Sequence, residues 1–139
     1  MFGWWGKSRG VVCADAIPQI NAHTDLGSLF QQEAVMLFKH STACPVSWAA
    51  HAQVMRFRAQ HRSVPLYLVP VIKERAASRA IAERTGVRHE SPQVILVRNG
   101  VVADSASHGA ITENRLSGML LQGTVNRSAG LAAGAPGAT

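Results

Sequence analysis

Cys44 stands where a thiol would be reactive. It follows the apolar run at 34–38 and directly precedes Pro45, a residue that suits the first turn of a helix. Unpaired backbone N–H groups at a helix N-terminus stabilise a thiolate, the form of cysteine that attacks disulfides. Ser47 occupies the position three residues on, where a dithiol motif has its second cysteine. Because serine cannot close an internal disulfide, the spacing predicts a monothiol site that an outside thiol must regenerate.

Four neighbours of Cys44 complete the candidate site around the thiol. Ser47 is able to donate a hydrogen bond to the thiolate, and Thr42 lies in the same loop. Lys39 and His40 come just before this loop, where a cation would hold the thiolate or a substrate carboxylate. The plainer alternatives are that Lys39 and His40 are solvated loop residues and that Cys44 is an inert buried cysteine.

Apolar periodicity and turn residues indicate the elements that position the thiol. The run at 34–38 is continuously apolar, which is typical of a strand buried on both faces of a sheet. Asn99-Gly100 is a favoured two-residue hairpin turn, and Gly86 is a left-handed helix stop. The predicted elements are an edge strand at 17–20, a helix from the cap Thr24 to about Gln32, a strand at 34–38, a helix at 45–61, a strand at 64–72, a helix at 74–85, hairpin strands at 94–98 and 101–105, and a last helix opening at Thr112.

The helix that follows Cys44 is predicted to be amphipathic. Its apolar residues Val46, Ala50, Val54 and Phe57 recur at spacings of four, four and three, so we expect them on the buried face.

The order of these elements, β-α-β-α-β-α-β-β-α, predicts the fold. A parallel first half, a crossover helix and a closing antiparallel hairpin are typical of the thioredoxin-like fold, an α/β fold with a mixed sheet and flanking helices. Alternating βα units would also fit a flavodoxin-like sheet, but the closing hairpin favours mixed pairing. We expect a thioredoxin-like domain at 17–121, a poorly structured arm at 1–16 and a disordered Gly/Ala-rich tail at 122–139.

Pro92 is the second element of the candidate site, because it directly precedes the apolar run at 94–97. A proline at this place in the thioredoxin fold is cis and lies beside the reactive sulfur, and a cis X–Pro bond is uncommon. The Ser91 backbone would then pair with the peptide-like part of a thiol substrate. Ser91, Pro92, Gln93 and His108 are therefore the candidate substrate-binding residues; the alternative is an ordinary loop proline.

Composition restricts the class of protein and its partners. The 139 residues suit one domain, no apolar run approaches the ~20 residues of a membrane span, and the start lacks a signal-peptide pattern. A net charge of +6 invites nucleic-acid binding, but the cations are scattered, and only Arg56, Arg58 and Arg62 approach a cluster. We therefore expect a cytoplasmic protein with neither membrane nor nucleic-acid partners.

The cysteines and histidines of the chain leave several alternatives open for metal binding and redox chemistry. The two cysteines and six histidines show no zinc-ligand spacing, so we expect no metal site. A monothiol protein could nevertheless share an iron–sulfur cluster with an external thiol. Cys13 could resolve Cys44 if the arm folded across the site. The chain could also be a binding or adaptor module with a regulatory or incidental cysteine, in which Trp4 and Trp5 would suit a partner contact.

Four motifs of the chain resemble those of a known family. They are FKHSTACPVS at 38–47, TGVRHESPQ at 85–93, Ser107-His108 and Ile111-Thr112. The chain resembles the YtxJ-type family, bacterial thioredoxin-fold proteins described as monothiol bacilliredoxins of the bacillithiol redox system, over about residues 17 to 121. The resemblance implies that Cys44 is the redox cysteine and that the reaction removes bacillithiol from modified cytosolic proteins. It further implies no tightly bound cofactor, with bacillithiol or another low-molecular-weight thiol such as glutathione as co-substrate.

Overall fold

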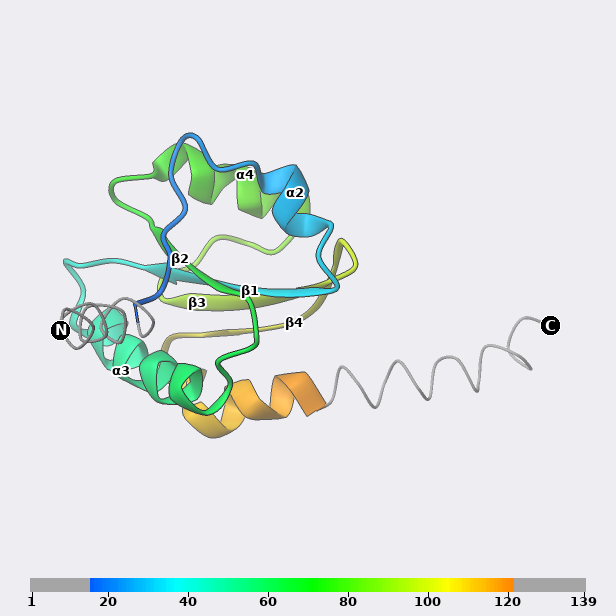
Figure 1. Ribbon diagram of the computed structural model, residues 1–139. Coiled ribbons are helices and arrows are strands. Elements are labelled where there is room, and N and C mark those ends of the chain that lie inside the picture. The colour runs from blue at the N-terminus through cyan, green and yellow to red at the C-terminus, as the bar shows by residue number, and fades with distance from the viewer. Residues whose placement is uncertain (1–15, 122–139) are drawn as a thin grey trace, which may run out of the picture.

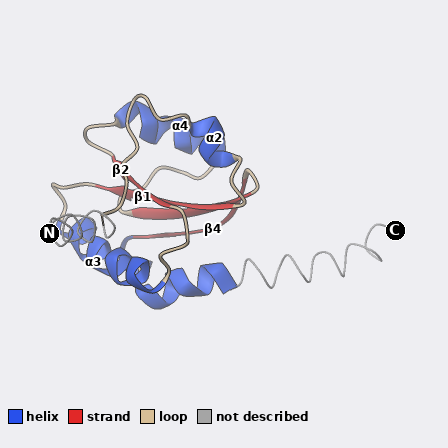
Figure 2. Ribbon diagram, in the orientation of Figure 1, coloured by secondary structure: helices blue, strands red, loops and turns tan. Residues whose placement is uncertain are grey.

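The computed structural model describes residues 16–121, which form three layers (Figure 1). A four-stranded sheet lies in the middle, with helices α2 (Leu26–Phe30) and α4 (Arg75–Thr85) on one face. Helix α3 (Pro45–Gln60) and a last helix over residues 113–121 cover the other face, as the colouring by secondary structure also shows (Figure 2). None of the helices within these residues is long and apolar enough to cross a bilayer.

Several of the sequence predictions fall outside this range. Cys13, Trp4 and Trp5, almost all of the predicted arm and the whole predicted tail lie outside the described residues.

The sheet pairs its strands in both directions. Its order is β2-β1-β3-β4, with β1 at Ala34–His40, β2 at Leu66–Pro70, β3 at Gln93–Arg98 and β4 at Val101–Ser107. Strand β1 is parallel to β2 and antiparallel to β3, and β3 is antiparallel to β4. This mixed pairing is the predicted thioredoxin-like arrangement, and it excludes an all-parallel flavodoxin-like sheet.

The predicted edge strand at 17–20 is reduced to one bridge beside β2. Gln19 pairs in parallel with Leu68. The Ile20 N–H donates to the Leu68 carbonyl at 2.9 Å, and the Leu68 N–H donates to the Pro18 carbonyl at 2.8 Å. Because Pro18 has no N–H group, it can accept from a ladder but cannot extend one.

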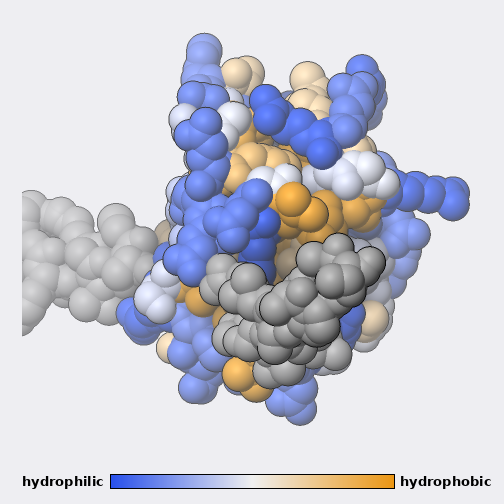
Figure 3. Space-filling model, turned by 90° about the vertical axis from the view of Figure 1, so that its right-hand side faces the viewer, coloured by the Kyte–Doolittle hydropathy of each residue, from blue (hydrophilic) through white to orange (hydrophobic). Residues whose placement is uncertain are grey.

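The turn between β3 and β4 has the predicted conformation. Asn99 (φ 52°) and Gly100 (φ 82°) both take positive φ, as a two-residue turn requires if it is to match the twist of the strands. Figure 3 shows the end of the molecule where this turn lies, with hydrophilic side chains around an apolar centre.

The helix caps confirm one prediction and correct another. Helix α4 ends, as predicted, at Gly86, which is left-handed with φ 72°. The N-cap of α2 is Asp25 and not the predicted Thr24, because the Asp25 carboxylate accepts the Ser28 N–H at 3.2 Å. Thr24 instead accepts the Asn21 N–H at 2.9 Å in the preceding turn. Aspartate outranks threonine as an N-cap, which accounts for the choice.

The inward face of α3 starts one residue later than predicted. The helix buries Ser47, Ala50, Val54 and Phe57, whereas Val46 is 46% exposed. The prediction that Val46 belongs to the core is therefore wrong. At 3.6 residues per turn, Val46 and Ser47 each complete an equally narrow stripe with the other three residues. The period therefore does not choose between them, and the packing of α3 against the sheet places the serine on the buried side.

Alternation along β1 divides the core into two halves. Met36 and Phe38 pack on the α3 side, and Val35 and Leu37 pack on the side of α2 and α4. All four side chains are fully buried, and each such burial contributes about 1.5–3 kcal/mol. Because side chains alternate between faces along a strand, β1 sends its next two residues to opposite sides of the sheet.

Candidate active site

Strand register brings three chain segments to one edge of the sheet. Lys39 of β1 pairs with Gln93 of β3, and Gln93 pairs with Ser107 of β4. The loop that leads to Cys44, the segment before β3 and the short 3-10 helix η1 at His108–Ala110 therefore leave the sheet at the same edge. This edge carries most of the residues that the sequence predicts to form the site.

Cys44 is the N-cap of α3, as its sequence context predicts. Its backbone is extended (φ −116°, ψ 121°), and Pro45 stands in the first turn. The Cys44 side chain makes no capping hydrogen bond, so the first-turn N–H groups, beginning at Val46, remain available to a thiolate. The thiol is half-buried and, within the described residues, is in no disulfide.

Ser47 and Trp48 hold the loop that carries Cys44. The Ser47 hydroxyl is fully buried and accepts the Ser41 N–H at 3.1 Å. The Trp48 Nε1–H donates to the Thr42 carbonyl at 2.9 Å, so Thr42 supports the loop through its backbone. Because the Ser47 oxygen accepts this bond, the Ser47 hydroxyl hydrogen remains available to another acceptor. A hydrogen bond from Ser47 to the Cys44 thiolate stays a prediction.

His40 is buried against aromatic rings and is not a solvated loop residue. Its ring meets the Trp48 ring edge-on at 4.6 Å between centroids and lies 5.4 Å from the Phe38 ring. Neither ring nitrogen has a hydrogen-bond partner in the described part of the chain. Burial is the main cause that lowers the pKa of His40, and the charge of His51 lowers it further. The Ser47 backbone raises this pKa, although it makes no hydrogen bond to the ring. His40 is therefore a neutral aromatic support at neutral pH.

His51 belongs to the same ring cluster, and the sequence reasoning missed it. Its ring lies 5.1 Å from that of His40 and 5.2 Å from that of Trp48. Burial lowers the pKa of His51 as well. A signal was present, because Ser47 and His51 are four residues apart and share one face of the helix.

Lys39 is not brought together with Cys44. Strand β1 runs two residues beyond its predicted end, so Lys39 points to the α4 side of the sheet and His40 to the α3 side. The Lys39 Nζ donates to the Ser78 carbonyl and to His89 Nδ1, each at 3.1 Å. Its side chain is fully buried, which lowers its pKa to about 8. Lys39 is neither a solvated loop residue nor part of the environment of the thiol.

The Ser91–Pro92 peptide bond is cis, as predicted. Pro92 is buried, and its carbonyl accepts the His108 N–H at 2.9 Å, which ties η1 to the proline. The His108 side chain is exposed. Within residues 16–121, neither the backbone nor the hydroxyl of Ser91 has a hydrogen-bond partner.

Gln93 holds the segment before β3 and does not face solvent. Its side chain is 2% exposed, and its amide donates to the Arg88 carbonyl at 3.0 Å and reaches Ser107 Oγ at 3.5 Å. Its Oε1 has no partner among the described residues. Gln93 therefore positions the loop that carries Ser91 and Pro92.

Comparison with protein families agrees with this geometry. The family described as monothiol bacilliredoxin BrxC matches residues 17–116, which is most of the chain. The chain belongs to this family. This bacilliredoxin-family chain also resembles a solved structure titled a putative oxidoreductase with a thioredoxin fold, at 30% sequence identity and a TM-score of 0.68, covering 74% of this chain and 92% of that one.

The fold of this bacilliredoxin-family chain is also similar to that of two thioredoxins. Thioredoxin from Trypanosoma brucei brucei is 8% identical, with a TM-score of 0.65 over 78% of this chain and 91% of that one. Thioredoxin f2 from Chlamydomonas reinhardtii is 14% identical, with a TM-score of 0.61 over 77% and 95%. Identities this low show the thioredoxin fold alone.

Family, fold and site together indicate thiol redox chemistry for this bacilliredoxin-family protein. Within residues 16–121, no three side chains of histidine, cysteine, aspartate or glutamate gather in a way that could hold a metal ion.

Proposed function

We propose that this protein is a monothiol thiol–disulfide oxidoreductase that removes bacillithiol, or a similar low-molecular-weight thiol, from mixed disulfides on cytosolic proteins. The proposal depends on one observation, which is that Cys44 is the N-cap of a 16-residue helix with Ser47 three residues later. A thiolate at this position is stabilised by the first-turn N–H groups, and Ser47 provides no second sulfur.

The exchange takes place in two balanced steps. The Cys44 thiolate attacks the small-thiol sulfur of a mixed disulfide, the sulfur–sulfur bond of the substrate breaks, and the protein substrate leaves as a thiolate that water protonates. A second small thiol, as thiolate, then attacks the disulfide on Cys44. It leaves with the first small thiol as their symmetric disulfide, and Cys44 is free again. The incoming small thiol is oxidised in the net reaction, and the protein thiol is restored.

Two features at the edge of the sheet where Cys44 lies suit a substrate that is a protein modified by a peptide-like thiol. The free N–H and C=O groups of Ser91 can pair with the amide of the small thiol, as an edge strand pairs with an added strand. Val46 and Trp48, within four residues of Cys44, are large apolar side chains that are 46% and 49% exposed, and such side chains suit contact with a protein partner.

The family description, monothiol bacilliredoxin, supports bacillithiol as the co-substrate. We expect bacillithiol to be used in turnover and not to be tightly bound. Glutathione is the alternative co-substrate in a host without bacillithiol. A reducing cytoplasm, which maintains a pool of small thiols, is the compartment in which this exchange would operate.

The direct test is intact-mass spectrometry after exposure of the reduced protein to oxidised bacillithiol or oxidised glutathione. We expect one small-thiol adduct on Cys44. Subsequent addition of the same thiol in its reduced form should remove this adduct. Cys44→Ser abolishes the adduct, and Cys13→Ser serves as the matched control that retains it.

Separate outcomes contradict separate parts of the proposal. If neither oxidised thiol adds to Cys44, thiol exchange is wrong. If the wild type instead forms an internal disulfide, seen as the loss of two hydrogen atoms, and only Cys13→Ser retains the adduct, the monothiol mechanism is wrong. With both thiols supplied in competition, preferential addition of glutathione would contradict bacillithiol as the co-substrate.

A further inference from the structure

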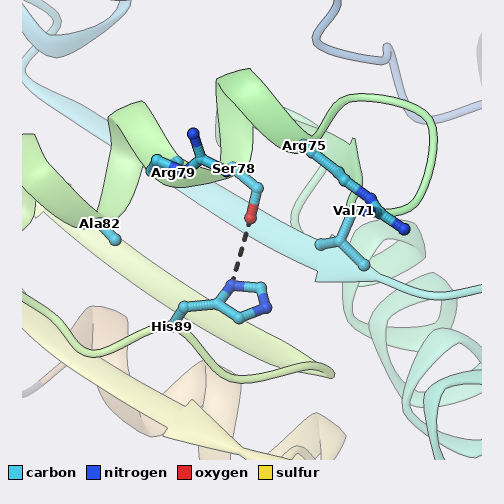
Figure 4. Close-up of a pocket in the computed structure, with 6 residues that line it drawn as sticks. All are labelled: Val71, Arg75, Ser78, Arg79, Ala82 and His89. Carbon is cyan, nitrogen blue, oxygen red and sulfur yellow. Dashed lines mark hydrogen bonds between the residues drawn. The ribbon is translucent and has the colours of Figure 1, made fainter.

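A pocket of about 340 Å³ lies on the α4 side of the sheet. Its lining is formed by Val71, Arg75, Ser78, Arg79, Ala82 and His89. Four of these residues recur at helical spacing, so one face of α4 makes a wall of the pocket. Figure 4 shows His89 on the facing loop, with the Ser78 hydroxyl directed at its ring, and the Ser78 Oγ to His89 Nδ1 distance is 3.2 Å. The volume is at the lower end of the range for small-molecule sites.

Lys39 places a positive charge directly behind this pocket. Its side chain is fully buried, and its Nζ bonds to two of the lining residues, Ser78 and His89. Although burial lowers the pKa of Lys39 to about 8, about nine-tenths of it is protonated at pH 7. Within residues 16–121 no carboxylate forms an ion pair with Lys39. Since buried charges are ordinarily paired, this one lacks its usual compensation.

Lys39 also determines which nitrogen of His89 carries the proton. An ammonium group can only donate, so His89 Nδ1 accepts, and the neutral ring carries its hydrogen on Nε2. Burial and, after it, the charge of Lys39 lower the pKa of His89, with Glu90 acting in the opposite direction. No residue within 16–121 makes a hydrogen bond to Nε2, which faces away from Ser78. The pocket therefore contains an open donor.

We propose that this pocket binds a small oxyanion, a carboxylate or a phosphate group, through Arg75, Arg79 and the Nε2–H of His89. Guanidinium groups bind both oxyanions through paired, charge-assisted hydrogen bonds. Both arginines are exposed, and neither has a carboxylate partner among the described residues. Lys39 adds a fixed positive charge in a region of low dielectric, where its attraction for an anion is strong.

The oxyanion site is independent of the proposed thiol exchange. It lies on the opposite face of the sheet from α3, and Cys44 contributes nothing to it. Cys44→Ser should therefore bind the oxyanion as the wild type does, so that failure of one proposal leaves the other standing.

The test is a titration of the full chain with inorganic phosphate and, separately, with succinate, followed by NMR of the histidine rings. We expect saturable shifts of the His89 signals at millimolar concentrations of at least one of the two probes. Arg75→Gln and Arg79→Gln should each weaken binding about tenfold, because each removes a charge-assisted hydrogen bond. Binding of phosphate alone identifies a phosphate group as the ligand, binding of succinate alone identifies a carboxylate, and binding of both supports a general oxyanion site.

Arg56→Gln is the matched control, because it removes the same charge from an exposed position on α3. It should leave the affinity unchanged. Equal weakening in Arg56→Gln would show that only net charge attracts the anion, and this would overturn the proposal. The absence of saturable shifts at His89 with both probes would also overturn it.

Discussion

The Nζ of Lys39 lies 3.1 Å from the Nδ1 of His89, a residue fifty positions later in the chain. This contact joins the end of β1 to the loop that leads to the cis Ser91–Pro92 bond. The contact also buries the Lys39 cation on the α4 face of the sheet. Cys44 begins α3 at the same edge of the sheet, but on the opposite face. The two faces of this edge therefore carry different groups, a buried ammonium and a helix-capping thiol, and each can be tested separately.

Lys39→Met is expected to remove a pH-dependent penalty on stability. The pKa of Lys39 is about 8 in the folded protein against 10.5 unfolded, so the unfolded chain binds more protons between these values. The free energy of unfolding of the wild type should therefore rise by up to about 3 kcal/mol as the pH increases from about 8 to 10.5, and below pH 8 the penalty is fully present. Methionine keeps the length of the side chain without its charge, so the variant should lack this rise.

Urea unfolding of the wild type and Lys39→Met on both sides of this pH interval measures the effect. Parallel profiles of unfolding free energy against pH would contradict the buried ammonium. Lys73→Met, at an exposed position before α4, is the matched control and should follow the wild type.

His40→Phe is expected to reduce the loss of stability in mild acid. Burial, and after it the charge of His51, lower the pKa of His40 below its usual 6.5. The unfolded chain therefore takes up a proton before the folded chain does, and stability falls as the pH drops below 6.5. Phenylalanine keeps a ring against Trp48 and cannot be protonated. Thermal unfolding between pH 7 and 5 should show a smaller decrease in Tm for the variant, and an equal decrease would contradict this account.

Ser47→Cys is expected to allow the site to close an internal disulfide with Cys44. Ser47 is fully buried in the first turn of α3, three residues from Cys44, and sulfur replaces its oxygen with little change of shape. The second thiol should attack a small-thiol adduct on Cys44, release the small thiol and leave an internal disulfide. Intact mass should show the adduct replaced by the loss of two hydrogen atoms. Ser47→Ala is the control that retains the adduct, and a stable adduct in Ser47→Cys would contradict the predicted geometry.

Asp104→Asn is expected to weaken the attachment of the last helix to β4. The two oxygens of Asp104 accept from the Arg115 guanidinium at 2.9 and 3.0 Å, and this bond is the main cause that lowers the pKa of Asp104. Its stabilising contribution is present above pH 3.8 and is lost as the pH falls through the lower folded pKa. Both side chains are partly exposed, so the pair contributes about 0.5–1 kcal/mol at neutral pH. A double-mutant cycle with Arg115→Gln measures it, and a coupling energy of zero at pH 7 would contradict the prediction.

Local features of the chain were predictable where short-range physics decides them. Gly86 ends α4 and Asn99-Gly100 turns the hairpin because positive φ is cheap at glycine and tolerated at asparagine. Cys44 begins α3 because Pro45 suits the first helical turn. The cis bond at Pro92 followed from the predicted fold and is confirmed.

The predictions were wrong where a shift of one residue along the chain puts a different side chain on the buried face or at the helix cap. Val46 is exposed because the helical stripe begins at Ser47, and Asp25 caps α2 in place of Thr24. Residue types near a boundary are compatible with either register, and only packing against the sheet selects one.

The sequence by itself determined the order of the elements after the first predicted strand, the helix-capping position of Cys44 and the serine where a dithiol motif has its second cysteine. Only the tertiary structure decided that Lys39 and His40, adjacent in the chain, serve opposite faces of the sheet. The physical reason is that β1 is paired on both sides as far as His40, so strand alternation extends through both residues. Lys39 then meets Ser78 and His89, and His40 meets Trp48, through contacts that depend on how distant segments pack.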